Sequence, residues 1–126
     1  MARVLLVDDN PVVVAVYRSG LSMAGFTVDT ASDGKAALEH AAATTPDVIV
    51  LDLMLPVIDG FEVLRRVRAD PGLKDVPVLV FSNSYTTART EELWAAGATQ
   101  VLAKATMTPK KLADILQAVV TQKPQP

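Results

Sequence analysis

The sequence predicts an α/β fold in which five parallel strands form a doubly wound sheet. Short apolar runs alternate with helical segments five times along the 126 residues. The run Val48–Leu51 contains no polar residue, which is typical of a strand buried on both faces of a parallel sheet. Short connections between the elements place helices on both faces of this sheet, and right-handed crossovers leave few topologies.

The first half of the chain supplies three strands and two helices. The apolar run Arg3–Val7 predicts the first strand. Asn10 and Pro11 form a helix start, with Asn as the N-cap and Pro at the first helical position. The Val-rich segment that follows favours a strand by propensity, but this cap and the stop at Gly25 predict a helix. The next elements are predicted as a strand over Thr27–Ala31, a helix over Lys35–Ala43 after Asp33-Gly34, and a strand over Pro46–Leu51.

The second half continues the alternation. Asp59 and Gly60 open a helix that extends to about Ala69, with its apolar residues on one face, and residues 70–72 end it. The remaining elements are predicted as a strand over Val76–Phe81, a helix over Thr86–Ala96, a strand over Thr99–Ala103, and a helix from Thr108-Pro109 with Leu112, Ile115, Leu116 and Val119 inward. We expect residues 1–121 to form one domain and residues 122–126 to be a tail or the start of a linker.

The composition narrows the class of protein. Half of the residues are hydrophobic and 21% are charged, which is typical of a globular domain. The net charge of −2, without a dominant basic face, argues against direct nucleic-acid binding. The chain has no cysteine, so disulfides and thiolate metal sites are excluded. No apolar stretch reaches the ~18 residues of a membrane span and no signal peptide precedes the first strand, so we expect a cytoplasmic protein.

Polar side chains stand at the carboxyl ends of the predicted strands. Asp8 and Asp9 follow the first strand, Asp52 the third, Ser82 the fourth and Lys104 the fifth. These ends meet at one edge of a parallel sheet, where open α/β sheets bind ligands. Three unpaired carboxylates repel one another, and Mg²⁺, which prefers oxygen ligands, would relieve that repulsion. An aspartate here can act as a nucleophile and form an aspartyl phosphate, whose charge the metal and the lysine would neutralise.

Taken together, the motifs Val7-Asp8-Asp9, Leu51-Asp52-Leu53-Met54-Leu55-Pro56 followed by Asp59-Gly60, Phe81-Ser82 and Lys104 are highly specific. The chain resembles the receiver domain of two-component response regulators, in the manner of a single-domain chemotaxis regulator, over nearly its whole length. The resemblance implies a flavodoxin-like sheet of strand order 2-1-3-4-5. It also implies a protein that is not an enzyme beyond its own phosphorylation and dephosphorylation. Its partners would be a histidine kinase or phosphotransfer protein and a downstream protein.

The family's functional residues can be carried over by position. Asp52 matches the phosphoacceptor and also a metal ligand. Asp9 matches the direct Mg²⁺ ligand, Asp8 its indirect partner, and the backbone carbonyl of Met54 the third protein contact of the metal. The remaining matches are Ser82 with the switch hydroxyl and Lys104 with the family's lysine.

Three positions depart from the family pattern. Ala105 stands where a proline with a cis bond is typical, Val101 where an aromatic switch residue is usual, and Asn83 where a small residue is common. A cis bond before Ala costs ~2.5–4 kcal/mol, against ~0.5–1 before Pro, so we expect the bond before Ala105 to be trans. Val101 cannot make a large rotameric swing, so we expect Trp94 to be partly exposed beside it and to contact the downstream partner instead.

Other functions fit the residues less well. A pseudo-receiver would use the same fold as a binding module without phosphotransfer, and Val101 and Ala105 favour it. A flavodoxin would need an anion-binding loop after the first strand, where the adjacent Asp8 and Asp9 repel phosphate. A phosphatase of the haloacid dehalogenase class would carry Asp-x-Asp at that place. His40 is interpreted as a solvated residue.

Overall fold

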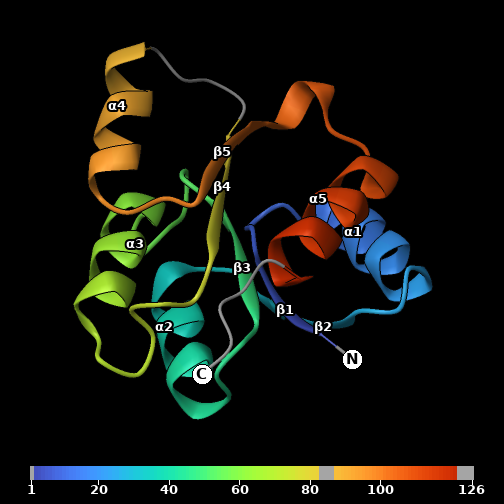
Figure 1. Cartoon of the computed structure of the whole chain (residues 1–126), viewed down its shortest axis with the longest axis horizontal. Coiled ribbons are helices and arrows are strands. Elements are labelled where there is room, and N and C mark those ends of the chain that lie inside the picture. The colour runs from blue at the N-terminus through green and yellow to red at the C-terminus, as the bar shows by residue number, and fades with distance from the viewer. Residues whose placement is uncertain (1, 83–86, 122–126) are drawn as a thin grey trace.

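The computed structural model describes residues 2–82 and 87–121. They form one five-stranded parallel sheet of order β2-β1-β3-β4-β5, which confirms the predicted flavodoxin-like, doubly wound fold (Figure 1). The strands are β1 (Arg3–Val7), β2 (Thr27–Ala31), β3 (Val48–Asp52), β4 (Val78–Ser82) and β5 (Gln100–Ala103).

The first three helices begin at side chains that cap them. The Asn10 side chain accepts hydrogen bonds from the N–H groups of the first turn of α1, and Asp33 and Asp59 do the same for α2 and α3. The helices are α1 (Pro11–Met23), α2 (Gly34–Ala43), α3 (Gly60–Ala69), α4 (Thr87–Ala95) and α5 (Pro109–Thr121), with a 3₁₀ turn η1 (Lys104–Thr106) before the last. No helix of the described ranges is long and apolar enough to cross a membrane.

The sheet separates two hydrophobic cores. Successive strand residues point to opposite faces, so Val4, Leu6 and Val50 pack with α1 and α5, whereas Leu5 and Leu51 pack with α2, α3 and α4. Figure 1 shows the two helical layers on either side of the sheet. All five residues of β3 and all five of β4 are buried, as expected for central parallel strands.

The predicted boundaries need small corrections. The strands β3 and β4 begin two residues later than predicted, because Pro46 and Pro77 lack the N–H group that a ladder requires. Each also extends one residue further, so that Asp52 and Ser82 are the last residues of their strands. The turn η1 was not predicted, since nothing in its short sequence has a helical period.

Candidate functional site

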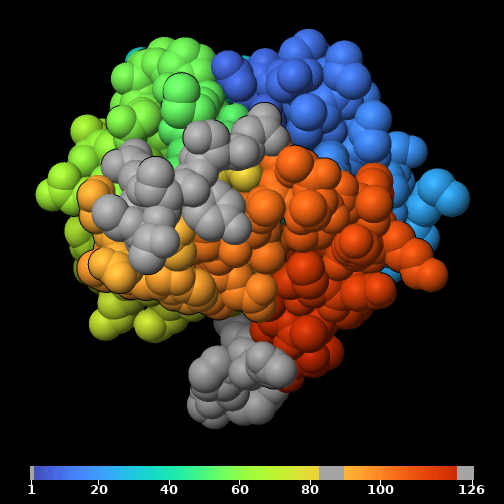
Figure 2. Space-filling view, turned by 90° about the horizontal axis from the view of Figure 1, so that it is seen from above, coloured from blue at the N-terminus to red at the C-terminus, as the bar shows by residue number. Residues whose placement is uncertain are grey.

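The site lies at the carboxyl edge of the sheet, where the strand register brings the polar side chains close together. Leu6 pairs with Val50, so Asp8 and Asp52, two residues further along each strand direction, reach the same height on the same face. Asp52 pairs with Phe81, and Phe81 pairs with Leu102, two residues before Lys104. In Figure 2 the blue start of α1, the green segment after β3 and the orange segment after β5 meet at this edge.

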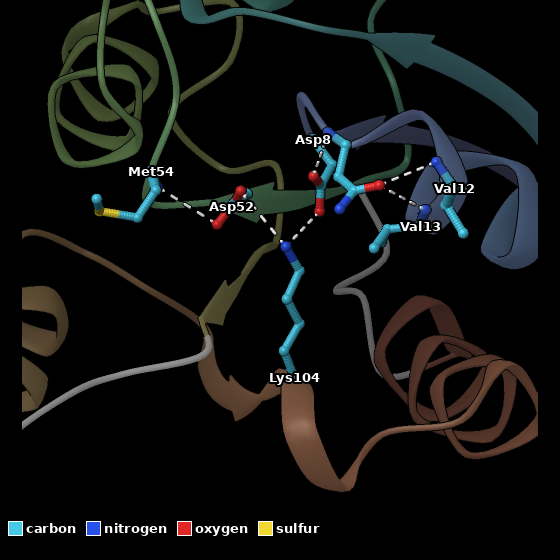
Figure 3. A network of polar contacts seen from close by, with 7 residues as sticks. Asp8, Val12, Val13, Asp52, Met54 and Lys104 are labelled. Carbon is cyan, nitrogen blue, oxygen red and sulfur yellow. Dashed lines mark hydrogen bonds and ion pairs between the residues drawn. The ribbon is translucent and has the colours of Figure 1, made fainter.

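Asp8 is held in place by the turn into α1. Its side chain is buried, and its Oδ1 accepts a hydrogen bond of 2.9 Å from the backbone N–H of Asn10. Asn10 in turn caps the helix by accepting bonds from Val12 and Val13, at 2.9 and 3.2 Å (Figure 3). The N-cap of α1 therefore fixes the orientation of the Asp8 carboxylate.

Lys104 points from η1 into the gap between Asp8 and Asp52 (Figure 3). Its Nζ lies 2.6 Å from Asp8 Oδ2 and 3.4 Å from Asp52 Oδ2. Asp8 Oδ2 has no other hydrogen-bond partner in the described chain, so this ion pair alone compensates its burial. The shorter distance shows that Lys104 pairs chiefly with Asp8.

Asp52 is less fully engaged than Asp8. Its Oδ1 accepts a long hydrogen bond of 3.3 Å from the Met54 N–H, and among the described residues the contact of its Oδ2 is with Lys104, at 3.4 Å. Both distances lie at or beyond the long end of the usual range for an N–H···O bond. The lone pairs of this carboxylate are thus available to a metal ion or an electrophile.

The electrostatics of the site follow from burial and charge. Burial raises the pKa of the Asp52 carboxyl above its ordinary value; Lys104 opposes this shift and repulsion from Asp8 adds to it. For Lys104, burial lowers the pKa, but contact with Asp8 and Asp52 outweighs burial and the net shift is upward. The lysine therefore stays charged, and the carboxylate of Asp52 is costly to keep ionised without a cation.

The described residues include one group of acids arranged to hold a metal ion. Asp8, Asp9 and Asp52 each place an oxygen within 4.8 Å of the others. Asp9 is exposed, and together with Asp8 and Asp52 it lines a hollow of about 360 Å³. The other lining residues are Asn10, Met54, Ser82 and Lys104. An open site of hard oxygen donors with room for water fits Mg²⁺.

The sequence-predicted site residues are thus all brought together, with Asp8, Asp9, Met54, Asp52, Ser82 and Lys104 lining one hollow. Gly60 was predicted only as part of the helix start, and its closeness to the site was missed: a Cβ there would lie 2.2 Å from the backbone oxygen of Asp52, so only glycine lets α3 start so close to the site. The Asp-Gly pair that starts α3 was its only signal. Tyr17 was also missed, and nothing in the Val-rich helix sequence marks it.

Three expectations outside the hollow have mixed outcomes. The described chain contains no cis peptide bond, so the Lys104–Ala105 bond is trans as predicted. Trp94 is 49% exposed, which confirms that part of its prediction, whereas Asn83 lies outside the described residues. The interpretation of His40 as a solvated residue is confirmed in part, since 36% of its side chain is exposed. Its Nε2, however, is buried and lies 3.1 Å from Asp29 Oδ2, because α2 packs against β2, a contact that the sequence does not reveal.

Comparison with known proteins places the chain in a family. The sequence pattern described as the response regulator receiver domain matches residues 4–117. The chain belongs to this family. It is 43% identical over 82 residues to the DNA-binding dual master transcriptional regulator RpaA of Synechocystis, and 49% identical over 80 residues to the transcriptional regulatory protein PrrA of Mycobacterium tuberculosis. These matches cover 65% and 64% of the chain but only 34% of either relative.

Solved receiver structures agree with the fold. The chemotaxis response regulator CheY4 of Vibrio cholerae is 37% identical, with a TM-score of 0.87 over 94% of the chain and 98% of the relative. The receiver domain of the sensor histidine kinase PA1611 of Pseudomonas aeruginosa, 31% identical, has a TM-score of 0.87 over 96% of the chain and 98% of the relative. That structure holds a magnesium ion in its active-site cleft.

The family assignment settles the alternatives of fold and class. The chain is a receiver domain whose cluster of three carboxylates offers ligands for a metal ion, and not a flavodoxin or a phosphatase of another fold. It is not an enzyme beyond the chemistry of its own phosphorylation. A receiver domain implies a histidine kinase as partner in two-component signalling.

Proposed function

We propose that Asp52 is the phosphoacceptor of this receiver domain. The observation that carries the proposal is the unequal engagement of the two buried aspartates. Asp8 is satisfied by Asn10 and by Lys104 at 2.6 Å, whereas the contacts of Asp52 within residues 2–82 and 87–121 are longer, at 3.3 and 3.4 Å. A nucleophile needs accessible lone pairs, so the chemistry falls to Asp52.

In the proposed reaction an Asp52 oxygen attacks the phosphorus of a phosphohistidine on the kinase. The new O–P bond forms as the P–N bond breaks, and the electron pair leaves on the imidazole, which takes up a proton from solvent. In this reaction Lys104 would pair with one phosphoryl oxygen, and Ser82 would donate its hydroxyl hydrogen to another. When bound by Asp9, Asp52 and the Met54 carbonyl, with Asp8 acting indirectly, Mg²⁺ would offset the charge of the phosphoryl oxygens.

The test is incubation of the chain with a small phosphodonor and Mg²⁺, read by intact mass. The wild type should gain one phosphoryl group, and Asp52→Asn should not. Asp114→Asn is the matched control, because Asp114 is an exposed aspartate on α5 that does not line the hollow. Asp9→Ala should weaken Mg²⁺ binding measured by titration calorimetry. A wild type that gains no mass with the donor, beryllofluoride or a cognate kinase would instead establish a pseudo-receiver.

We also propose that a downstream protein docks on the face that carries Trp94 and Val101. Among the large exposed hydrophobic side chains of the described residues, Trp94 is the aromatic one, and an amphipathic ring suits an interface anchor. Val101 packs against the core with little freedom at χ1. The chain has one tryptophan, so its fluorescence should change on phosphorylation or partner binding. Trp94→Ala should weaken binding of the partner and leave the phosphorylation of Asp52 intact. If the substitution only lowers the melting temperature of the protein, the docking role is refuted.

The extent and setting of the domain are further parts of the proposal. We take residues 1–121 as the receiver domain and residues 122–126 as a tail or the start of a linker. The family match over residues 4–117 supports this division, and residues 122–126 lie outside the described chain. The chain spans about a third of the length of the curated relatives, so any regulation of transcription would belong to additional domains. A cytoplasmic location stays a prediction.

A further inference from the structure

The segment that carries Lys104 has little covalent stiffness of its own. Lys104 opens the single 3₁₀ turn η1, and Ala105 in its middle has a trans bond and an exposed side chain. The hydrogen bonds of a 3₁₀ turn have poorer geometry than those of an α-helix, so the turn by itself holds its residues less firmly. Contacts from outside the turn therefore help to keep the lysine between Asp8 and Asp52.

Tyr17 of α1 makes the contact that meets this need. Its hydroxyl donates a hydrogen bond of 3.0 Å to the backbone carbonyl of Met107, the residue just after η1. The two residues are 90 positions apart in the sequence, and Tyr17 is 8% exposed. Burial raises the pKa of the Tyr17 hydroxyl, with Lys104 opposing, so the hydroxyl keeps its proton and remains a donor.

The ring of Tyr17 makes a second contact, with Phe81, on the side of the site. It meets the Phe81 ring edge to face, with centroids 5.3 Å apart and an angle of 82° between the planes. Lys104 Nζ lies 5.6 Å from the centroid of Phe81, within the range of a cation–π contact. Tyr17 thus contacts Phe81, and Phe81 contacts the ammonium group of Lys104.

A second contact ties α1 to the far end of the loop. A Cβ on Gly20 would lie 2.3 Å from Cβ of Pro109, the first residue of α5, so the helix backbone lies directly against that proline. Figure 1 shows α1 and α5 side by side on one face of the sheet. The helix α1 therefore contacts the connection between β5 and α5 at Met107 and the first residue of α5 at Pro109.

We propose that Tyr17 is a positioning residue for Lys104: its hydroxyl fixes the carbonyl of Met107, and its ring supports Phe81, so that the lysine stays between Asp8 and Asp52. The helix α1 then orients the site from two sides, because Asn10 at its start fixes Asp8. The consequence for phosphoryl transfer rests on the proposed function of Asp52, but the positioning itself does not.

The first experiment tests positioning without phosphoryl transfer. Lysines are acylated briefly with acetic anhydride and mapped by mass spectrometry in the wild type and in Tyr17→Phe, which loses only the hydroxyl. The side chain of Lys104 is 11% exposed, so it should react slowly in the wild type and several-fold faster in the variant. Lys110, which is exposed on α5, should not change. Ser19→Ala, which removes an exposed hydroxyl from the same helix, is the matched control.

The second experiment asks whether Tyr17 acts through Lys104. Loss of one hydrogen bond in Tyr17→Phe should slow phosphorylation of Asp52 by a small donor about three- to tenfold. The affinity for Mg²⁺ should be the same in Tyr17→Phe as in the wild type, since the substitution changes neither Asp9 nor Asp52. In a Lys104→Met background the same change should cause no further loss, because the residue it positions is gone. A merely structural role would slow both backgrounds equally.

Two results would overturn the positioning role: unchanged reactivity of Lys104 in Tyr17→Phe, or equal rate losses with and without Lys104. If the wild type is not phosphorylated at all, the proposed function of Asp52 fails, while the acylation pattern still decides the role of Tyr17.

Discussion

Val57 is the one non-glycine residue of the described chain with a positive φ, at 69°. It lies in the loop between Asp52 and α3, three residues after Met54, and 76% of it is exposed. A β-branched residue in the left-handed region is a genuine outlier, because its Cβ crowds the neighbouring backbone. We predict that replacing Val57 by glycine or asparagine stabilises the fold.

The size of the effect can be worked out from these values. The left-handed conformation costs an L-residue about 1–2 kcal/mol, and little burial is lost on removing so exposed a side chain. The unfolded state of a glycine variant gains entropy worth about 0.5–1 kcal/mol, which leaves a net stabilisation of roughly 0.5–1 kcal/mol. A chain of 126 residues has an unfolding entropy of about 265 cal/mol/K at ~2.1 cal/mol/K per residue. The melting temperature should therefore rise by about 2–4 °C.

The assay is thermal unfolding followed by circular dichroism, with urea titration as a second measure. Val57→Ala is the control, because alanine keeps the Cβ and should gain much less than glycine. Val57→Asn should gain as well, since asparagine tolerates the left-handed region without the full entropy loss of glycine. If Val57→Gly melts at or below the wild-type temperature, or if Val57→Ala gains as much, then the strain argument is refuted.

Three further predictions concern the site and its supports. Burial raises the pKa of Asp52, so the ionised carboxylate lowers the free energy of unfolding as pH rises through that raised pKa. Asp52→Asn should therefore stabilise the protein at pH 7, and this gain should shrink in acid, where the wild-type carboxyl is protonated. Denaturant midpoints between pH 3 and 8 would measure this, and a flat difference would contradict it. Arg68→Ala should lower the free energy of unfolding by about 2–3 kcal/mol, measured by urea titration, because the partly buried guanidinium donates to three backbone carbonyls. Arg68→Lys should not restore this stability, since an ammonium group cannot reproduce the geometry of the guanidinium. Gly60→Ala should cost about 1–3 kcal/mol by clashing with the Asp52 backbone, whereas Gly72→Ala, which meets only a side-chain oxygen at 3.4 Å, should not; equal melting temperatures would refute the close approach.

The sequence alone determined the sheet and the positions of the acids. Runs such as Val48–Leu51 are typical of strands buried on both sides of a parallel sheet, and the alternation with helices favours that sheet, so the carboxylate after the run is expected at the carboxyl edge. The caps Asn10 and Asp59 likewise determine where α1 and α3 begin, because their side chains satisfy N–H groups only a few residues away. These are local rules, and a single sequence contains the information that they need.

The tertiary structure decided which of these groups meet. Nothing in the sequence shows that Lys104 lies closer to Asp8 than to Asp52, since that depends on how η1 sits over the sheet. The bond from Tyr17 to Met107 joins residues 90 positions apart, and the contact of His40 with Asp29 depends on how α2 packs against β2. Such contacts are set by packing between elements, because side chains adjust to the space that their neighbours leave, and no local pattern records that space.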